Sequence, residues 1–189
     1  TYLQRADWGV FSDNLFYNPK RKPEEKDGQY SGKFDDRYAF TNKDSRREYL
    51  VAAILSASSR VLGDYDQNLA QECQEVAERI WNYEENHDPV FYRSVGTPRS
   101  LIAERTNAAV ELFLTTNNKQ YLQAVVERQS EILEEINNIA WTISRIIDST
   151  DDKNFISEYE ERLQEYSAEN AAHLALSPFG VTMRQQVWG

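Results

Sequence analysis

The sequence of 189 residues has few cysteines, glycines, prolines and basic residues. Because Cys73 is the only cysteine, a disulfide within the chain is impossible, and we interpret this thiol as a small buried side chain on an apolar helix face. No stretch approaches the roughly 18 consecutive apolar residues of a membrane span, so we expect no membrane partner. The 21 Lys and Arg residues against 31 Asp and Glu residues give a net charge of −10. This excess of acidic residues argues against a nucleic acid partner, because phosphate binding rests on Lys and Arg.

Clusters of metal ligands are also missing from the sequence. His87 and His173 are the only histidines, and neither has a second ligand at the helical spacing of three or four. The segment 148–153 contains three aspartates, but their spacing matches no calcium loop, and helix capping explains them better. We therefore predict no metal site and no cofactor.

Apolar residues recur at steps of three and four along much of the sequence, and this spacing predicts helices. One helical hairpin is predicted over 49–62 and 67–81, and a second over 101–113 and 119–136. A fainter third hairpin follows, with an apolar face over 139–147 that places Trp141 in the core. Residues 1–43 are predicted to be a long irregular segment, and residues 44–189 to be helical hairpins.

The helix ends carry recognisable signals. Asp44 or Ser45 is expected to cap the first helix. Thr97 is expected to cap the helix of the second hairpin, with Pro98 in its first turn, where no N–H is needed. Gly63 suits the left-handed position after a helix.

Connections between the predicted helices alternate in length. The turns at 63–66 and 115–118 are short, whereas the connection 82–96 between the hairpins is long and carries Phe91 and Tyr92. In a ring of hairpins the long connections gather on one rim, where function is expected. The aromatic side chains of Phe91 and Tyr92 would suit a sugar, whose C–H faces stack on aromatic rings. A purely structural role, in which the rings fix the loop to the helices, is equally consistent with the sequence.

Three segments of the sequence carry distinctive residue patterns: the small residues of 52–62, the run 103–122 with its Thr-Asn-Asn-Lys-Gln-Tyr-Leu turn, and the ending 177–189 with Val-Trp-Gly. Together they resemble glycoside hydrolase family 9, whose catalytic domain is an (α/α)6 barrel of six helical hairpins. The run 52–62 (Ala-Ala-Ile-Leu-Ser-Ala-Ser-Ser-Arg-Val-Leu) is similar to the small-residue helix of that family. The run 103–122 looks like the acidic and apolar helix followed by the T-G-D-x-x-Y-L turn. The ending 177–189 resembles the N-P-x-G-V … W-G segment. The resemblance implies an all-α fold of helical hairpins that form part of the (α/α)6 barrel.

The family motifs for the catalytic base (D-A-G-D) and acid (N-E) do not occur in this sequence. At about fifty residues per hairpin, a complete barrel would need roughly 300 residues or more. We therefore expect residues 1–189 to be the central part of the catalytic domain of a larger hydrolase. The exposed flank of its helices would be covered by the remainder of the barrel or by self-association.

By resemblance, the intact protein would hydrolyse β-1,4-glucosidic bonds of cellulose or related glucans with inversion, which requires a carboxylic acid and a carboxylate about 6.5–9.5 Å apart. We expect this chain to supply no catalytic residue and to be inactive alone. Its candidate substrate-binding residues are Trp188, Arg37, Tyr38, Phe91 and Tyr92. The partner would be a polysaccharide or oligosaccharide, and family members are mostly secreted or periplasmic.

Two other hypotheses fit the same helices. A non-enzymatic repeat scaffold would have a period of about 34 to 47 residues and uniform connections, which the alternating connections disfavour. Another (α/α) toroid enzyme acting on carbohydrates, such as a lyase or an unsaturated-uronide hydrolase, would differ only in its flanking motifs.

Overall fold

The computed structural model describes residues 2–5, 16–17, 20, 22, 24–25, 30–31, 37–40, 42–92, 98, 100–176 and 178, and in the strands it describes the backbone alone. The chain divides into two compact units, Thr1–Lys43 and Asp44–Gly189.

The first unit contains four short strands. Strand β1 (Tyr2–Arg5) pairs antiparallel with β4 (Arg37–Phe40), and β2 (Phe16–Tyr17) pairs in parallel with β3 (Tyr30–Ser31). The sequence predicts an irregular segment here, and these strands correct that prediction for the described residues. Strands of two to four residues are too short to show an alternating apolar pattern, although the aromatic residues in them favour extended backbone.

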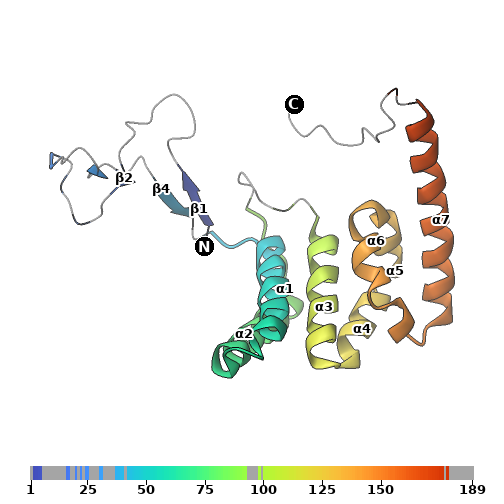
Figure 1. The fold of residues 1–189 in the computed structure, drawn as a ribbon, viewed down its shortest axis with the longest axis horizontal. Coiled ribbons are helices and arrows are strands. Elements are labelled where there is room, and N and C mark those ends of the chain that lie inside the picture. The colour runs from blue at the N-terminus through green and yellow to red at the C-terminus, as the bar shows by residue number, and fades with distance from the viewer. Residues whose placement is uncertain are drawn as a thin grey trace. The chain divides into compact units, whose positions relative to one another are not determined.

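The second unit is helical throughout its described residues, apart from its turns and connections. Its elements, drawn in Figure 1, are α1 (Ser45–Leu62), α2 (Gln67–Glu85), α3 (Leu101–Thr116), α4 (Lys119–Val126), α5 (Gln129–Glu134), α6 (Ile136–Ser144), the 3-10 turn η1 (Ile147–Ser149) and α7 (Lys153–Leu176). Helices α1 and α2 form the first predicted hairpin, and α3 with α4 forms the second.

The first helices of the two hairpins, α1 and α3, lie side by side (Figure 1) and pack closely. Both helices contribute small side chains to the core, because Ala52 and Ala53 of α1 and Ala108 and Ala109 of α3 are all buried. The hydroxyls of Ser56 and Thr115 are 2.7 Å apart and link the two helices. Small side chains let the two backbones approach while the hydroxyls satisfy each other in the interior.

The core continues from α3 through α5 and α6 to α7. Ile132, Ile136, Ile139 and Ile143 are buried, and Phe155 of α7 closes the cluster. They recur at steps of three and four, as the sequence predicts, so they share one side of the chain. Burial of such a side chain contributes roughly 1.5–3 kcal/mol, which makes this row the main support of α5 and α6.

The regular periodicity over 121–136 predicts one continuous helix, and the structure corrects this. The backbone leaves the helical conformation at Arg128 (φ −108°, ψ 23°) and again at Glu135 (φ −103°, ψ 25°). Neither break has a glycine or proline to announce it. Periodicity shows which side chains face the core, but it does not show whether the backbone hydrogen bonds are continuous.

The helix ends follow the predicted signals only in part. Asp44 caps α1 as predicted. The N-cap of α3 is Ser100, whose hydroxyl accepts from the Ala103 N–H at 3.0 Å, and not Thr97, which lies outside the described residues. Gly63 has right-handed backbone angles (φ −53°), and the left-handed residue is Asn117 (φ 54°), which ends α3.

The connections lie at opposite ends of the hairpins. Figure 1 shows the turn between α3 and α4 at the lower end of these helices and the starts of α1 and α3 at their upper end. Residues 90–92, the last described residues before the gap in the connection, are hydrogen-bonded to the start of α1. We call the upper site, formed by residues 44–46 at the start of α1 and residues 90–92 of the connection, the loop rim. The described helices include none that is long and apolar enough to cross a membrane.

Candidate functional site

The loop rim is held together by polar groups of α1. The Ser45 N–H donates to the Val90 carbonyl at 2.8 Å, and the Val90 N–H donates to the Ser45 hydroxyl at 2.9 Å. Because Ser45 is fully buried, water competes little for this pair of bonds. The start of α1 therefore fixes the backbone of the connection at Val90.

Asp44 extends this clamp by two residues. Its carboxylate caps α1, accepts from the Arg46 guanidinium (Nη2 at 2.6 Å and Nε at 3.1 Å) and accepts from the Tyr92 N–H at 2.7 Å. Burial by itself raises the pKa of Asp44, but the hydrogen bonds from Arg46 and from the Tyr92 amide outweigh it and lower the pKa. The carboxylate is therefore ionised near neutral pH and acts as a fixed acceptor.

This clamp leaves the aromatic rings outside. Phe91 is 57% exposed and Tyr92 is 37% exposed. The Arg46 guanidinium lies 5.2 Å from the centre of the Phe91 ring, which is a cation–π distance. Hydrogen bonds from α1 fix the backbone of the loop, and the contact between Arg46 and the Phe91 ring adds to them. Both residues keep exposed surface on the loop rim, Phe91 more than Tyr92.

A second polar network ties together the helix ends next to the loop rim. The Glu85 carboxylate at the end of α2 accepts from the Arg105 guanidinium of α3 at 2.7 and 2.6 Å, and from the Tyr49 hydroxyl of α1 at 2.7 Å. The guanidinium also lies over the Trp81 ring, 5.4 Å from its centre. Burial raises the pKa of Glu85, but the bonds from Arg105 and Tyr49 outweigh this effect and lower it. Three helices are therefore joined by one ionised carboxylate.

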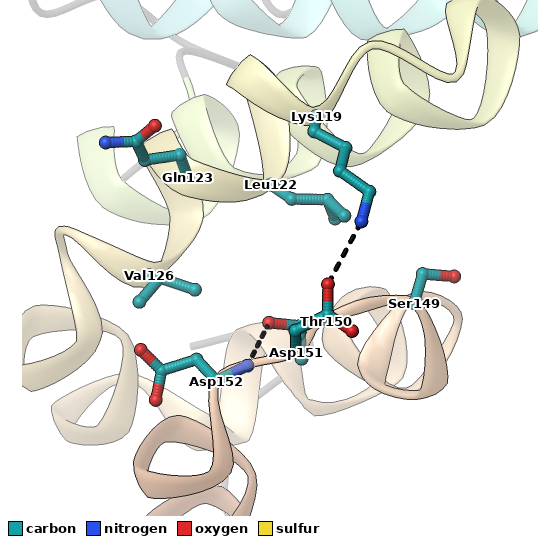
Figure 2. A pocket seen from close by; sticks show the side chains of 8 residues that line it. All are labelled: Lys119, Leu122, Gln123, Val126, Ser149, Thr150, Asp151 and Asp152. Atoms are coloured by element: carbon teal, nitrogen blue, oxygen red, sulfur yellow. Dashed lines mark hydrogen bonds and ion pairs between the residues drawn. The ribbon is translucent and has the colours of Figure 1, made fainter.

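The opposite end of the helices carries a different kind of cavity, shown in Figure 2. This pocket of about 260 Å³ lies between α4 and residues 149–152, and its lining includes Leu122 and Val126 beside polar side chains. Lys119 pairs with Asp151 at 3.0 Å across it, and the Asp152 carboxylate accepts from the Phe155 N–H at 2.9 Å. The capping role predicted for this acidic segment is confirmed at Asp152. The described residues that line this pocket include no aromatic ring, in contrast to the loop rim.

Among the described residues, no group of three or more His, Cys, Asp or Glu side chains is placed to hold a metal ion. The Asp44 carboxylate accepts from Arg46 and the Tyr92 N–H, and the Glu85 carboxylate accepts from Arg105 and the Tyr49 hydroxyl. The loop rim as described combines two partly exposed rings with two carboxylates that are each paired with an arginine.

Comparison with known proteins decides the family. The model of Glycosyl hydrolase family 9 matches residues 2–189. The chain belongs to glycosyl hydrolase family 9. No curated protein sequence matches it.

A solved structure supports the fold of this family 9 chain. The crystal structure of a metagenome-derived glycoside hydrolase family 9 endoglucanase matches with a TM-score of 0.62 and 16% sequence identity. The match covers 95% of this chain and 33% of that one, so the chain spans about a third of the length of that protein. The predicted fold class, all-α hairpins forming part of an (α/α)6 barrel, is confirmed.

The structure places the five candidate substrate-binding residues in different settings. Phe91 and Tyr92 lie on the loop rim, with Asp44 and Arg46 as partners that the sequence did not reveal. Arg37 and Tyr38 lie on β4, in the other compact unit. Trp188 lies outside the described residues.

The predicted core position of Trp141 is wrong, because its side chain is 78% exposed on α6.

Proposed function

We propose that the intact family 9 protein hydrolyses β-1,4-glucosidic bonds of cellulose or related glucans with inversion. This chain would supply scaffold and one part of the substrate cleft. The observation that carries the proposal is the loop rim, where hydrogen bonds fix the connection and leave the Phe91 and Tyr92 rings exposed. The faces of a glucose ring are lined by C–H groups, and they stack on such rings.

The remaining parts of the proposed site follow from the family. Arg37, Tyr38 and Trp188 stay proposed substrate contacts. The acid and base of an inverting reaction would come from outside this chain, and the chain alone would be inactive. Its exposed apolar residues on α1, Val51, Ile54 and Val61, would be covered by the remainder of the barrel or by a second copy. A secreted or periplasmic location accords with a polymeric substrate.

The loop rim is tested by removing its rings one at a time from the intact protein. We expect Phe91→Ala and Tyr92→Ala each to raise KM for a soluble β-1,4-glucan by about tenfold, which corresponds to roughly 1.4 kcal/mol of lost binding. Tyr65→Ala is the matched control, because this tyrosine is 84% exposed in the turn between α1 and α2. An unchanged KM in both rim variants would refute the role of the rim.

The stereochemistry is tested separately by proton NMR of the first product formed. Inversion at a β-linkage yields the α-anomer first, and early release of the β-anomer would contradict the mechanism. Glucan hydrolysis by the 189-residue chain alone would refute the proposal that the catalytic pair lies elsewhere.

A further inference from the structure

The connection from α2 to α3 contains the one Asp–Pro pair of the sequence, Asp88–Pro89. Both residues are exposed. Within the described part of the chain, neither residue takes part in a hydrogen bond or an ion pair, and a proline has no N–H to donate. Water therefore reaches this peptide bond, and its cleavage would remove no internal hydrogen bond.

The residues on both sides of the pair are anchored to helices. On the α2 side, Nδ1 of His87 donates to the Tyr83 carbonyl at 2.7 Å, and the two rings stack with their centres 4.0 Å apart. On the loop rim side, Val90 makes two hydrogen bonds with Ser45, at 2.8 and 2.9 Å. A protonated histidine donates from both ring nitrogens, and neither bond of Ser45 involves a group that titrates in acid. Both anchors are therefore kept in mildly acidic solution.

An aspartate followed by a proline has the groups needed for intramolecular cleavage. The Asp88 side-chain carboxylate can bond to the Asp88 main-chain carbonyl carbon and close a succinic anhydride ring, a nucleophilic step that proximity favours. The bond from that carbon to the Pro89 nitrogen breaks, and the nitrogen takes a proton from solvent and leaves as a secondary amine. Water then opens the anhydride, which restores the side-chain carboxyl group and leaves a new α-carboxyl group on Asp88.

We propose that Asp88–Pro89 is a self-cleavage site in mildly acidic solution, and that the cut protein persists as an assembled two-chain form. One chain ends at Asp88 and the other begins at Pro89. The loop rim is kept in this form, because Ser45 of the first chain still holds Val90 of the second. The reaction consumes one water molecule and does not depend on the proposed hydrolysis of glucans.

The two chains would be held together by the contact between the hairpins. Helices α1 and α3 pack side by side across the cut (Figure 1), and the Ser56 and Thr115 hydroxyls join them at 2.7 Å. The Glu85 carboxylate accepts from Arg105 across the cut at 2.7 and 2.6 Å, and the lowered pKa of Glu85 keeps this pair ionised in mild acid. Loss of one exposed peptide bond leaves all of these contacts in place, so we expect the chains to stay associated.

Cleavage is tested by incubating the intact protein in mildly acidic buffer below its unfolding temperature, with circular dichroism to verify that it is folded. Mass spectrometry with peptide mapping should find one chain that ends at Asp88 and one that begins at Pro89. The Asp64–Tyr65 bond is the control within the same sample, because it lies in the exposed turn between α1 and α2 and no proline follows the aspartate. It should stay intact.

Two variants separate the intramolecular reaction from ordinary acid hydrolysis. Asp88→Ala removes the nucleophile and Pro89→Ala removes the leaving group, so each should abolish cleavage at this bond. Cleavage of Asp88→Ala at the wild-type rate would refute the mechanism. If the folded wild type stays intact over a period in which a urea-unfolded sample at the same pH is cut, the fold blocks the reaction and the site is refuted.

The two-chain form is tested after the cut protein is returned to neutral pH. We expect both chains to elute together in gel filtration and to separate only in urea, with the Val90 amide still exchanging slowly with deuterated water. Separation without urea, or loss of protection at Val90, would refute the assembled form. These measurements involve no glucan, so their outcome and the outcome for the proposed function are independent.

Discussion

The network around Glu85 offers a sharp test of what holds the two hairpins together. Glu85→Ala removes the carboxylate that accepts two bonds from Arg105 and one from Tyr49. The Arg105 guanidinium would keep its bond to the Ala124 carbonyl at 2.9 Å. It would nevertheless remain a buried charge without its partner, and we expect the protein to be destabilised for that reason.

The magnitude follows from burial. The side chains of Arg105 and Glu85 are 10% and 25% exposed. Loss of one partner from a fully buried pair costs about 3–5 kcal/mol. Water can reach the guanidinium through the partly open side of the site, so we expect about 2–3 kcal/mol.

The chain contains a matched control for this substitution. Lys119 and Asp151 form a pair of similar length, 3.0 Å, but their side chains are 74% and 91% exposed. An exposed pair contributes about 0–1 kcal/mol, so Asp151→Ala should have little effect. The contrast isolates burial as the cause.

Urea and thermal unfolding followed by circular dichroism measure both variants. At about 2–4 °C per kcal/mol for a chain of this size, Glu85→Ala should lower Tm by roughly 4–12 °C and Asp151→Ala by less than about 4 °C. Equal losses from the two variants would refute the assignment of stability to the buried pair.

The effect of Glu85 should also depend on pH. Because its pKa is lowered in the folded protein, the unfolded chain binds the proton more readily, and the stabilisation is present above the unfolded pKa. It is lost as the pH falls through the folded pKa. The difference in stability between wild type and Glu85→Ala should therefore shrink in acid, and a difference that stays constant to low pH would contradict the role of the ionised carboxylate.

The remaining predictions concern helix ends and one half-buried acid. Gly63→Ala should stabilise the protein by about 0.4–1 kcal/mol, since the added Cβ would lie 3.6 Å from the Ser59 carbonyl oxygen, an ordinary contact, and the backbone is right-handed. Asn117→Ala should cost about 1 kcal/mol at a left-handed position. Ser100→Ala should cost about 1 kcal/mol through loss of the α3 cap. Glu104→Gln should stabilise the protein at neutral pH and lose that gain in acid, because burial raises the pKa of Glu104. Urea unfolding checks all four, and a change of the opposite sign contradicts the respective prediction.

The two hairpins could be predicted from the sequence because their signals are local. Apolar residues at steps of three and four mark α1 to α4, and small residues in α1 and α3 mark the faces that pack together. Trp141 shows the limit of this method. Ile139 and Ile143 are each two residues away from Trp141, which at about 100° per residue places the indole on the side of α6 opposite to them. A run of apolar residues therefore did not by itself justify a core position.

The loop rim was only half visible in the sequence for a related reason. Phe91 and Tyr92 stand out as aromatic residues in a long connection, but their role depends on what else fixes that connection. Asp44 fixes it, because its carboxylate accepts a hydrogen bond from the Tyr92 N–H, 48 residues along the chain. Asp44 is recognisable as a helix cap, and a cap normally uses its carboxylate on the first turn alone. Here the same carboxylate also fixes the backbone of the loop through the Tyr92 N–H, a link that no local pattern in the sequence indicates.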